Sequence, residues 1–96
     1  MYRKKRFFVG YDISKNKGRT KIQKKLDAYG VRWQYSNYLC EFFPKDLEEV
    51  RKFCEKWMEK DDTVVWIPIS DPLLKKIHFQ GTPKNRLDEA EPTILS

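Results

Sequence analysis

The sequence predicts an α+β domain in which two helices cover one face of a four-stranded antiparallel sheet. Segments rich in β-branched and aromatic residues alternate with segments of helical periodicity, in the order β-α-β-β-α-β. That order is the split βαβ arrangement, whose right-handed crossovers bring both helices to the same face of the sheet. The length of 96 residues allows one domain with a single core.

Residues 7–13 (FFVGYDI) form the first predicted strand, which is apolar on both faces and therefore expected at the centre of the sheet. A polar turn follows, with possible helix caps in Ser14 and Asn16. Residues 19–29 then show helical periodicity, because their apolar side chains recur at positions that share one helix face. Gly30 is expected to end this helix in the left-handed conformation.

Residues 31–43 (VRWQYSNYLCEFF) alternate in the manner of two strands, which a tight turn at Ser36 and Asn37 would join into a hairpin. A second helix is expected over residues 46–60, because its first residue and Glu49 form a capping-box pattern. One face of this helix is apolar and consists of Leu47, Val50, Cys54, Trp57 and Met58.

The fourth strand, residues 63–70, contains Pro68, which cannot donate a ladder hydrogen bond, so either this strand lies at a sheet edge or Pro68 marks its end. Residues 73–81 (LLKKIHFQG) are predicted to add one short strand to the edge of their own sheet or of a partner's. These elements define a ferredoxin-like domain over residues 1–81. Residues 82–96 are polar and are predicted to be disordered.

With both helices on one face, the other face of the sheet would be bare. The strands nevertheless carry apolar residues on both sides, among them Phe8, Trp33 and Tyr35. An uncovered apolar sheet face predicts an interaction partner, and face-to-face packing of two copies into a homodimer is the simplest way to bury it.

The charge of +6 is unevenly distributed along the chain. Residues 1–32 contain eleven Lys and Arg against two Asp, a net charge of +9. Residues 33–96 contain nine basic and twelve acidic residues, a net charge of −3. This asymmetry suggests a polyanionic partner such as nucleic acid for the N-terminal third, although a solvated helix face plus a basic tail is the alternative.

The two cysteines, Cys40 and Cys54, belong to no CxxC pair, and we expect both to be reduced and buried in a cytoplasmic protein. No apolar run approaches the roughly 20 residues that a membrane-spanning helix needs, so no membrane partner is expected. The basic N-terminus is followed by only a short apolar stretch, so a cleaved signal peptide is not expected either.

Asp12 ends the first predicted strand at the point where the sheet opens to solvent. A carboxylate in this position could bind a hard cation, but it could instead cap the first helix or pair with Arg19 or Lys21, which is the more common role of an isolated aspartate. One carboxylate is a small ligand set for Mg²⁺, which takes six oxygens. A two-fold axis near Asp12 would double the number of carboxylates.

Basic residues surround this strand end and are the candidates for phosphate contacts: Lys15, Lys17, Arg19, Lys21 and Arg32. Such contacts would carry no information on base identity, and an exposed helix face is the structural alternative. Tyr11, Tyr38 and Trp33 could stack on bases, although core packing is the more common fate of aromatic residues.

Three segments together resemble the CRISPR-associated protein 2 family, the small adaptation protein that partners the CRISPR integrase. They are YDIS at the end of the first strand, the R-x-K pair of the first helix, and G-x-R-x-QYS-x-Y in the predicted hairpin region. The match covers roughly residues 7–81. The resemblance implies ferredoxin-like homodimers with stacked sheets and a C-terminal strand that reaches the partner's sheet.

The resemblance also implies roles for single residues. Asp12 matches the family's metal-binding aspartate and would be the catalytic residue. Tyr11, Arg19 and Arg32 match its neighbours in the family's site. Two further positions depart from the pattern, because Lys21 and Tyr38 stand where some members carry arginine and phenylalanine.

The resulting hypothesis is a CRISPR adaptation protein that acts in antiviral defence as a metal-dependent endonuclease on single-stranded RNA or double-stranded DNA. Asp12 would hold Mg²⁺ or another hard divalent cation in this protein. The alternative is a non-catalytic dimeric scaffold that binds duplex DNA by its backbone and bridges integrase subunits. A toxin-like ribonuclease on the same fold is a third, more distant possibility.

Overall fold

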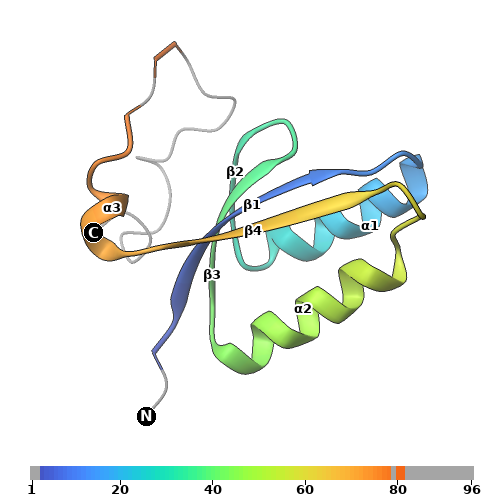
Figure 1. Ribbon diagram of the computed structural model, residues 1–96, viewed down its shortest axis with the longest axis horizontal. Helices are drawn as coiled ribbons and strands as arrows, with labels where there is room; N and C mark the ends of the chain where they lie inside the picture. The colour runs from blue at the N-terminus through green and yellow to red at the C-terminus, as the bar shows by residue number, and fades with distance from the viewer. Residues whose placement is uncertain (1–2, 79, 82–96) are drawn as a thin grey trace.

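The computed structural model describes residues 3–78 and 80–81. Its strands are β1 (Lys5–Asp12), β2 (Gly30–Gln34), β3 (Asn37–Phe42) and β4 (Thr63–Ile69), and its helices are α1 (Asn16–Asp27), α2 (Pro44–Lys56) and α3 (Asp71–Leu74). The strands form one antiparallel sheet in the order β2-β3-β1-β4, with α1 and α2 together on one face (Figure 1). The predicted α+β ferredoxin-like fold is confirmed. None of the described helices could span a membrane.

β1 occupies a central place in the sheet, as predicted, and its residues alternate between two environments. Phe7, Val9 and Tyr11 are buried in the core that the sheet forms with α1 and α2. Phe8 and Asp12 belong to the opposite face, because successive side chains of a strand point to opposite sides. We call this second face the open face, and its side chains include Phe8, Asp12, Leu39, Val65 and Ile67.

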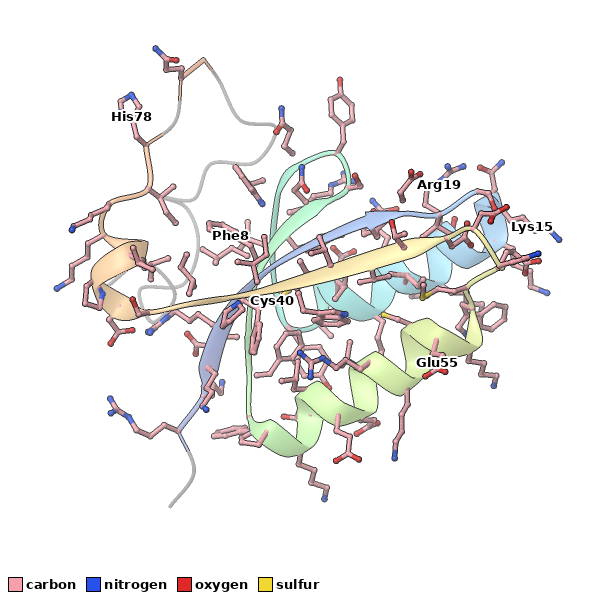
Figure 2. The ribbon with its side chains drawn as sticks, in the orientation of Figure 1. Phe8, Lys15, Arg19, Cys40, Glu55 and His78 are labelled. Carbon is pink, nitrogen blue, oxygen red and sulfur yellow. The ribbon has the colours of Figure 1, made fainter. Side chains whose placement is uncertain are left out.

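Two free thiols lie buried between the sheet and the helices, and Figure 2 labels one of them, Cys40. Burial raises the pKa of Cys40 to about 12 and that of Cys54 to about 11. Both thiols therefore stay protonated at neutral pH. The prediction that the cysteines are reduced and buried is confirmed.

The first helix and the strand after it differ from the predicted boundaries. α1 begins at Asn16, and its N-cap residue Lys15 has no side-chain capping bond, so the caps predicted at Ser14 and Asn16 are wrong. Gly30 does not end a helix in the left-handed conformation but begins β2. A Cβ at this position would lie 2.1 Å from the carbonyl oxygen of Leu39, so glycine allows β2 to approach β3 closely.

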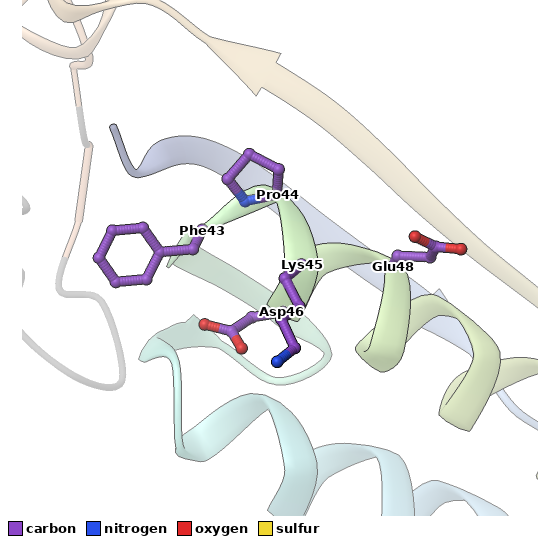
Figure 3. Close-up of a pocket in the computed structure, with 5 residues that line it drawn as sticks. All are labelled: Phe43, Pro44, Lys45, Asp46 and Glu48. Carbon is purple, nitrogen blue, oxygen red and sulfur yellow. The ribbon is translucent and has the colours of Figure 1, made fainter. Parts of the chain in front are cut away.

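α2 begins at Pro44 instead of Asp46, because proline suits the first helical position, where its missing N–H costs no intrahelical bond. Its predicted apolar face is confirmed, and the following residues pack in the core: Leu47, Val50, Cys54, Trp57 and Met58. Beside the start of the helix lies a cavity of about 620 Å³ (Figure 3), lined by Phe43, Pro44, Lys45, Asp46 and Glu48. This cavity includes none of the predicted site residues.

In the segment predicted as a strand, residues 73–81, the described residues form no strand in the sheet of their own chain, and pairing with a partner's sheet stays a prediction. Leu73 and Leu74 belong to α3, and the described residues after them form no strand. A helix starts here because the hydroxyl oxygen of Ser70 accepts a hydrogen bond from the Leu73 N–H and because Pro72 occupies the first turn. The tail predicted to be disordered, residues 82–96, lies outside the described residues.

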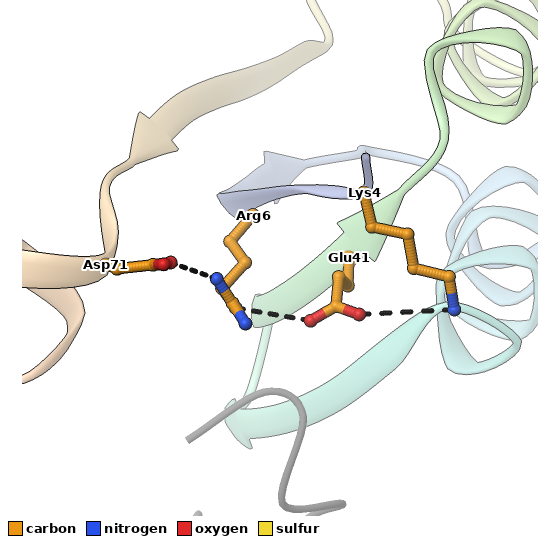
Figure 4. A network of polar contacts seen from close by, with 4 residues as sticks. All are labelled: Lys4, Arg6, Glu41 and Asp71. Carbon is orange, nitrogen blue, oxygen red and sulfur yellow. Dashed lines mark hydrogen bonds and ion pairs between the residues drawn. The ribbon is translucent and has the colours of Figure 1, made fainter. Parts of the chain in front are cut away.

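A network of four charged side chains fastens α3 to the sheet (Figure 4). The guanidinium of Arg6 donates to the carboxylate of Asp71 on α3, and its Nε lies 3.2 Å from Oε2 of Glu41. Lys4 approaches the other oxygen of Glu41 at 4.0 Å. Part of the basic N-terminal arm is therefore already paired with carboxylates of its own chain.

α3 covers only part of the open face. Leu74 packs on Leu39, and Phe8, Val31, Trp33, Ile69 and Ile77 surround this second cluster. β4 forms the sheet edge that Pro68 predicted, and its residues Val65 and Ile67 remain 52% and 49% exposed. The open face thus keeps an uncovered apolar strip along β4.

Gly18 offers a test of the packing between α1 and α2. A Cβ at Gly18 would lie 2.6 Å from the backbone oxygen of Trp57. Gly18→Ala should gain about 0.5–1 kcal/mol of helix propensity but lose more through the clash, for a net loss of about 1 kcal/mol in the free energy of unfolding. Urea denaturation would measure this change in the free energy of unfolding, with Thr20→Ala on the exposed side of the same helix as control. A Gly18→Ala protein more stable than wild type would contradict the packing.

Candidate functional site

Asp12 stands at the carboxyl end of β1, exposed on the open face and opposite Thr63 of β4. Its carboxylate forms no hydrogen bond or ion pair with any residue in 3–78 or 80–81. Neither structural alternative for Asp12 is therefore realised here, because the N-cap of α1 is Lys15 and the Arg19 side chain binds elsewhere. Among the described residues, the Asp12 carboxylate is therefore free to accept a further ligand.

The side chains near Asp12 that could ligate a metal limit the kinds of metal site that can form there. The described part of the chain holds no group of three or more His, Cys, Asp or Glu side chains that could bind a metal ion. Figure 2 shows His78 at the opposite end of the molecule from Lys15 and Arg19. Mg²⁺ is commonly bound through one or two carboxylates together with water and substrate phosphates. Asp12 fits that mode, in which most oxygen ligands come from outside one chain.

Arg19 is held at the same end of the sheet as Asp12. Its Nη1 donates to the backbone oxygen of Ile13 at 3.2 Å, and its Nη2 donates to Oδ1 of Asn16. Lys15 lies nearby (Figure 2) and pairs with Glu59 at 3.4 Å, but both of these side chains are more than half exposed. Such an exposed pair is weak, so Lys15 can exchange Glu59 for a phosphate at little cost.

Tyr38 is fully buried, so of the two possibilities left open by the sequence, stacking on a base and packing in the core, the structure shows core packing. Its hydroxyl donates to Oδ1 of Asp27 at 2.6 Å, and its ring lies 6.3 Å from the ring of Tyr11, which is also buried. Burial raises the pKa of Tyr38, and the hydrogen bond to Asp27 raises it further. Neither tyrosine offers a ring face to a base, so both serve the core.

Arg32 lies on the helix-side face of β2, opposite Tyr38 in the ladder. Burial raises the pKa of the Tyr11 hydroxyl, while the positive charges of Arg32 and Arg19 oppose that rise. The two arginines therefore both lie near Tyr11, at the edge between α1 and the sheet. Sequence reasoning missed Asp27, whose charge lies in the same cluster.

Lys17 and Lys21 do not join Arg19 at the strand end. Their ammonium groups lie over the ring of Trp57, at 5.7 and 5.4 Å from its centre. Trp57 follows the last turn of α2, so these lysines belong to the helical layer. The predicted basic set is divided between the strand end and the helices.

Tyr35 is an exposed aromatic residue that the sequence reading left out of the site. It lies in the β2–β3 turn with a φ of 33° and is 69% exposed. The turn falls on Tyr35 and Ser36, one residue earlier than predicted, and the Ser36 oxygen accepts a hydrogen bond from the Tyr11 N–H at 3.1 Å. Positive φ values are uncommon for residues other than glycine and often mark functional positions. If the turn had been assigned to Tyr35 and Ser36, Tyr35 would have been recognised as an exposed turn residue and Tyr38 as a residue of the following strand.

Asp62 positions the loop that follows Asp12. Its two carboxylate oxygens accept hydrogen bonds from the Ser14 N–H at 2.9 Å and from the Glu59 N–H at 2.7 Å. Those bonds lower the pKa of Asp62 below its usual value of 3.8, chiefly the one from Glu59. The sequence had not indicated this role for Asp62.

Together, the fold and this site define a small ferredoxin-like domain that presents a strand-end carboxylate beside exposed cations. The family model described as CRISPR associated protein Cas2 matches residues 5–77, and the chain belongs to that family. A curated relative, the CRISPR-associated endoribonuclease Cas2 3 of Synechocystis sp. PCC 6803, is 28% identical over 78 residues. That alignment covers 80% of this chain and 85% of the relative.

Solved structures share the fold of this chain. The hypothetical protein TT1823 from Thermus thermophilus has a TM-score of 0.74 at 24% identity, over 85% of this chain and 96% of its own. The Cas2 structure from Streptococcus pyogenes at pH 6.5 has a TM-score of 0.73 at 17% identity, over 79% of this chain and 99% of its own. At these identities the likeness concerns the fold.

The buried hydrogen bond of Tyr38 predicts a purely structural role. Tyr38→Phe should lower the free energy of unfolding by about 1 kcal/mol, because the bond to Asp27 is lost while that carboxylate can still reach water. Affinity for nucleic acid should not change. Chemical denaturation and a binding titration would measure both quantities, with Tyr11→Phe as a control in which no hydroxyl bond to a carboxylate is lost. If Tyr38→Phe binds nucleic acid more weakly than wild type, the purely structural role is wrong and Tyr38 takes part in binding.

The lowered pKa of Asp62 predicts a pH dependence of stability. The ionised carboxylate stabilises the folded state above about pH 3.8, and this contribution disappears as the pH falls through the lower pKa of the folded state. When the free energy of unfolding is measured by urea denaturation between pH 7 and pH 3, it should therefore fall more steeply with decreasing pH for wild type than for Asp62→Asn. Parallel curves for the two proteins would contradict the assignment.

Proposed function

We propose that this chain is a CRISPR adaptation protein that hydrolyses phosphodiester bonds in single-stranded RNA or double-stranded DNA with the help of Asp12. The exposed, unpartnered carboxylate of Asp12 beside Arg19 is the observation that carries the proposal. Membership of the Cas2 family supports it, as does a curated relative that bears the name endoribonuclease.

The active form would be a homodimer packed through the open face. Val65 and Ile67 expose apolar surface there, next to the strand end that carries Asp12. A two-fold related copy would cover this surface, and the isologous contact would place both Asp12 carboxylates at the same interface. The described part of one chain brings no second carboxylate into a metal-binding group with Asp12, so in the proposed dimer the second would come from the partner copy.

Each residue of the site has a separate task in this proposal. Asp12 would hold Mg²⁺ or another hard divalent cation, with water and substrate phosphate as the remaining ligands. When bound, the cation supplies Lewis-acid stabilisation of the charge on the scissile phosphate. Arg19, already fixed by Ile13 and Asn16, would bind a phosphate oxygen, and Lys15 would add a second contact. Tyr35 would contact the nucleic acid from the neighbouring turn.

A non-catalytic scaffold is the second candidate, and one observation favours it. No second carboxylate joins Asp12 to form a metal-binding cluster within the described ranges. In this reading the dimer binds duplex DNA by its backbone and bridges two units of the CRISPR integrase. Its binding would be independent of base sequence, sensitive to salt and indifferent to Asp12.

Asp12→Ala separates the two functions. If the proposal holds, Mg²⁺-dependent cleavage of RNA and duplex DNA falls by a factor on the order of 100, because the cation loses its protein ligand. Duplex binding in EDTA stays within about twofold of wild type, since Asp12 makes no phosphate contact of its own. Asp61→Ala, which removes an exposed carboxylate from the α2–β4 loop, is the matched control. Equal cleavage by Asp12→Ala and wild type would rule out the nuclease mechanism and leave the scaffold.

A further inference from the structure

Three lysines of the helical layer converge on one tryptophan. Lys17 and Lys21 of α1 lie 5.7 and 5.4 Å from the centre of the Trp57 ring. Lys56, in the last turn of α2, approaches the same ring at 5.9 Å. Cation–π attraction explains why they gather there, since each such contact is worth about 0.5–1 kcal/mol at an exposed site.

The cluster continues one turn further along both helices. Lys25, four residues after Lys21, lies 5.0 Å from the ring centre of Phe53, and this ring is 6.4 Å from that of Trp57. We call the whole group the lysine patch, which consists of Lys17, Lys21, Lys25, Lys56, Phe53 and Trp57. It lies on the helix-covered side of the sheet, the side away from the open face.

No carboxylate neutralises this patch within the described residues. The ion pairs of the helical layer are Lys15 with Glu59 and Lys52 with Glu48, and neither includes a lysine of the patch. The indole N–H of Trp57 likewise has no hydrogen-bond acceptor there. Four like charges thus stand close together with no ion-pair partner among the described residues, and a polyanion would relieve their repulsion.

The geometry of the patch matches a row of phosphates. Lys17, Lys21 and Lys25 recur every four residues along α1 and therefore form a stripe roughly 12 Å long. Each strand of a DNA duplex carries one phosphate per about 3.4 Å of helix axis, so a stripe of this length can reach more than one phosphate of a strand.

The surroundings of the patch favour a duplex over other polyanions. The large apolar side chains that are exposed lie elsewhere, at Tyr35, Phe43, Val65, Ile67 and Leu73. A protein partner would need an apolar interface core that the patch lacks. Phe53 and Trp57 are only partly exposed and have lysines over their rings, so they offer little stacking surface to a single strand.

We propose that the lysine patch is a second contact surface for the backbone of duplex DNA, separate from the strand end at Asp12. It rests on the proposed nucleic-acid role of the chain but not on metal-dependent cleavage. A copy packed on the open face leaves the helical layer uncovered. One dimer therefore presents a patch on each of its two outer sides and can hold two duplex segments, or one that bends around it.

Salt-dependent binding of the full-length protein to a labelled duplex of arbitrary sequence tests the patch. The measurement is made in EDTA, so that cleavage cannot interfere. Relative to wild type, the double variant Lys21→Gln, Lys25→Gln should lower the slope of log affinity against log salt by about 2 and weaken binding on the order of tenfold at moderate salt. Lys21→Arg, Lys25→Arg should keep both the slope and the affinity, because it keeps both charges.

Lys45→Gln, Lys52→Gln is the matched control, since it removes two exposed charges from α2 outside the patch. An equal loss of affinity in this control and in the patch variant would overturn the proposal by showing a net-charge effect. So would wild-type slope and affinity in the patch variant, which would make an acidic protein the partner to test next. If wild type itself fails to bind the duplex, the proposed nucleic-acid function fails together with the patch.

Discussion

The pairing of β1 with both β3 and β4 determines where the functional groups of this protein lie. Because a strand alternates between faces, β1 sends Phe7, Val9 and Tyr11 into the core and carries Asp12 on the open face. A register slip of one residue would bury Asp12 beneath the helices and expose Tyr11. The cost of burying that carboxylate, added to the exposure of the core residues of β1, strongly favours the observed register.

Much of the fold could be predicted because its signals are local. The central position of β1 follows from its apolar residues on both faces, and the edge position of β4 follows from Pro68. The errors arise at residues whose conformation depends on contacts with distant parts of the chain. Gly30 resembles a helix terminator in sequence, but its real constraint is the carbonyl of Leu39 on the next strand. The helix at Asp71–Leu74 was missed because the alternating residues after it suggested a strand.

The candidate site was predicted in part, for the same physical reason. Asp12 and Arg19 could be placed because both flank one strand end. Tyr38 could not be placed, because the alternation of residues in a strand does not show which of two apolar faces the helices cover. Its hydroxyl group in fact donates a hydrogen bond to Asp27 beneath the helices. The lysines of α1 could be recognised as basic but not assigned to Trp57, since that contact depends on how two helices pack.

The two buried thiols have a practical consequence for studying this protein. Cys40 and Cys54 are the only cysteines of the chain, and their high pKa values leave almost no thiolate at neutral pH. A cysteine introduced on the surface, for example in place of Thr20, would react with maleimide reagents far faster than either of them. Fluorophores or spin labels could therefore be attached at chosen sites without first replacing the native cysteines. Distances across the proposed dimer could then be measured by resonance energy transfer or pulsed electron paramagnetic resonance.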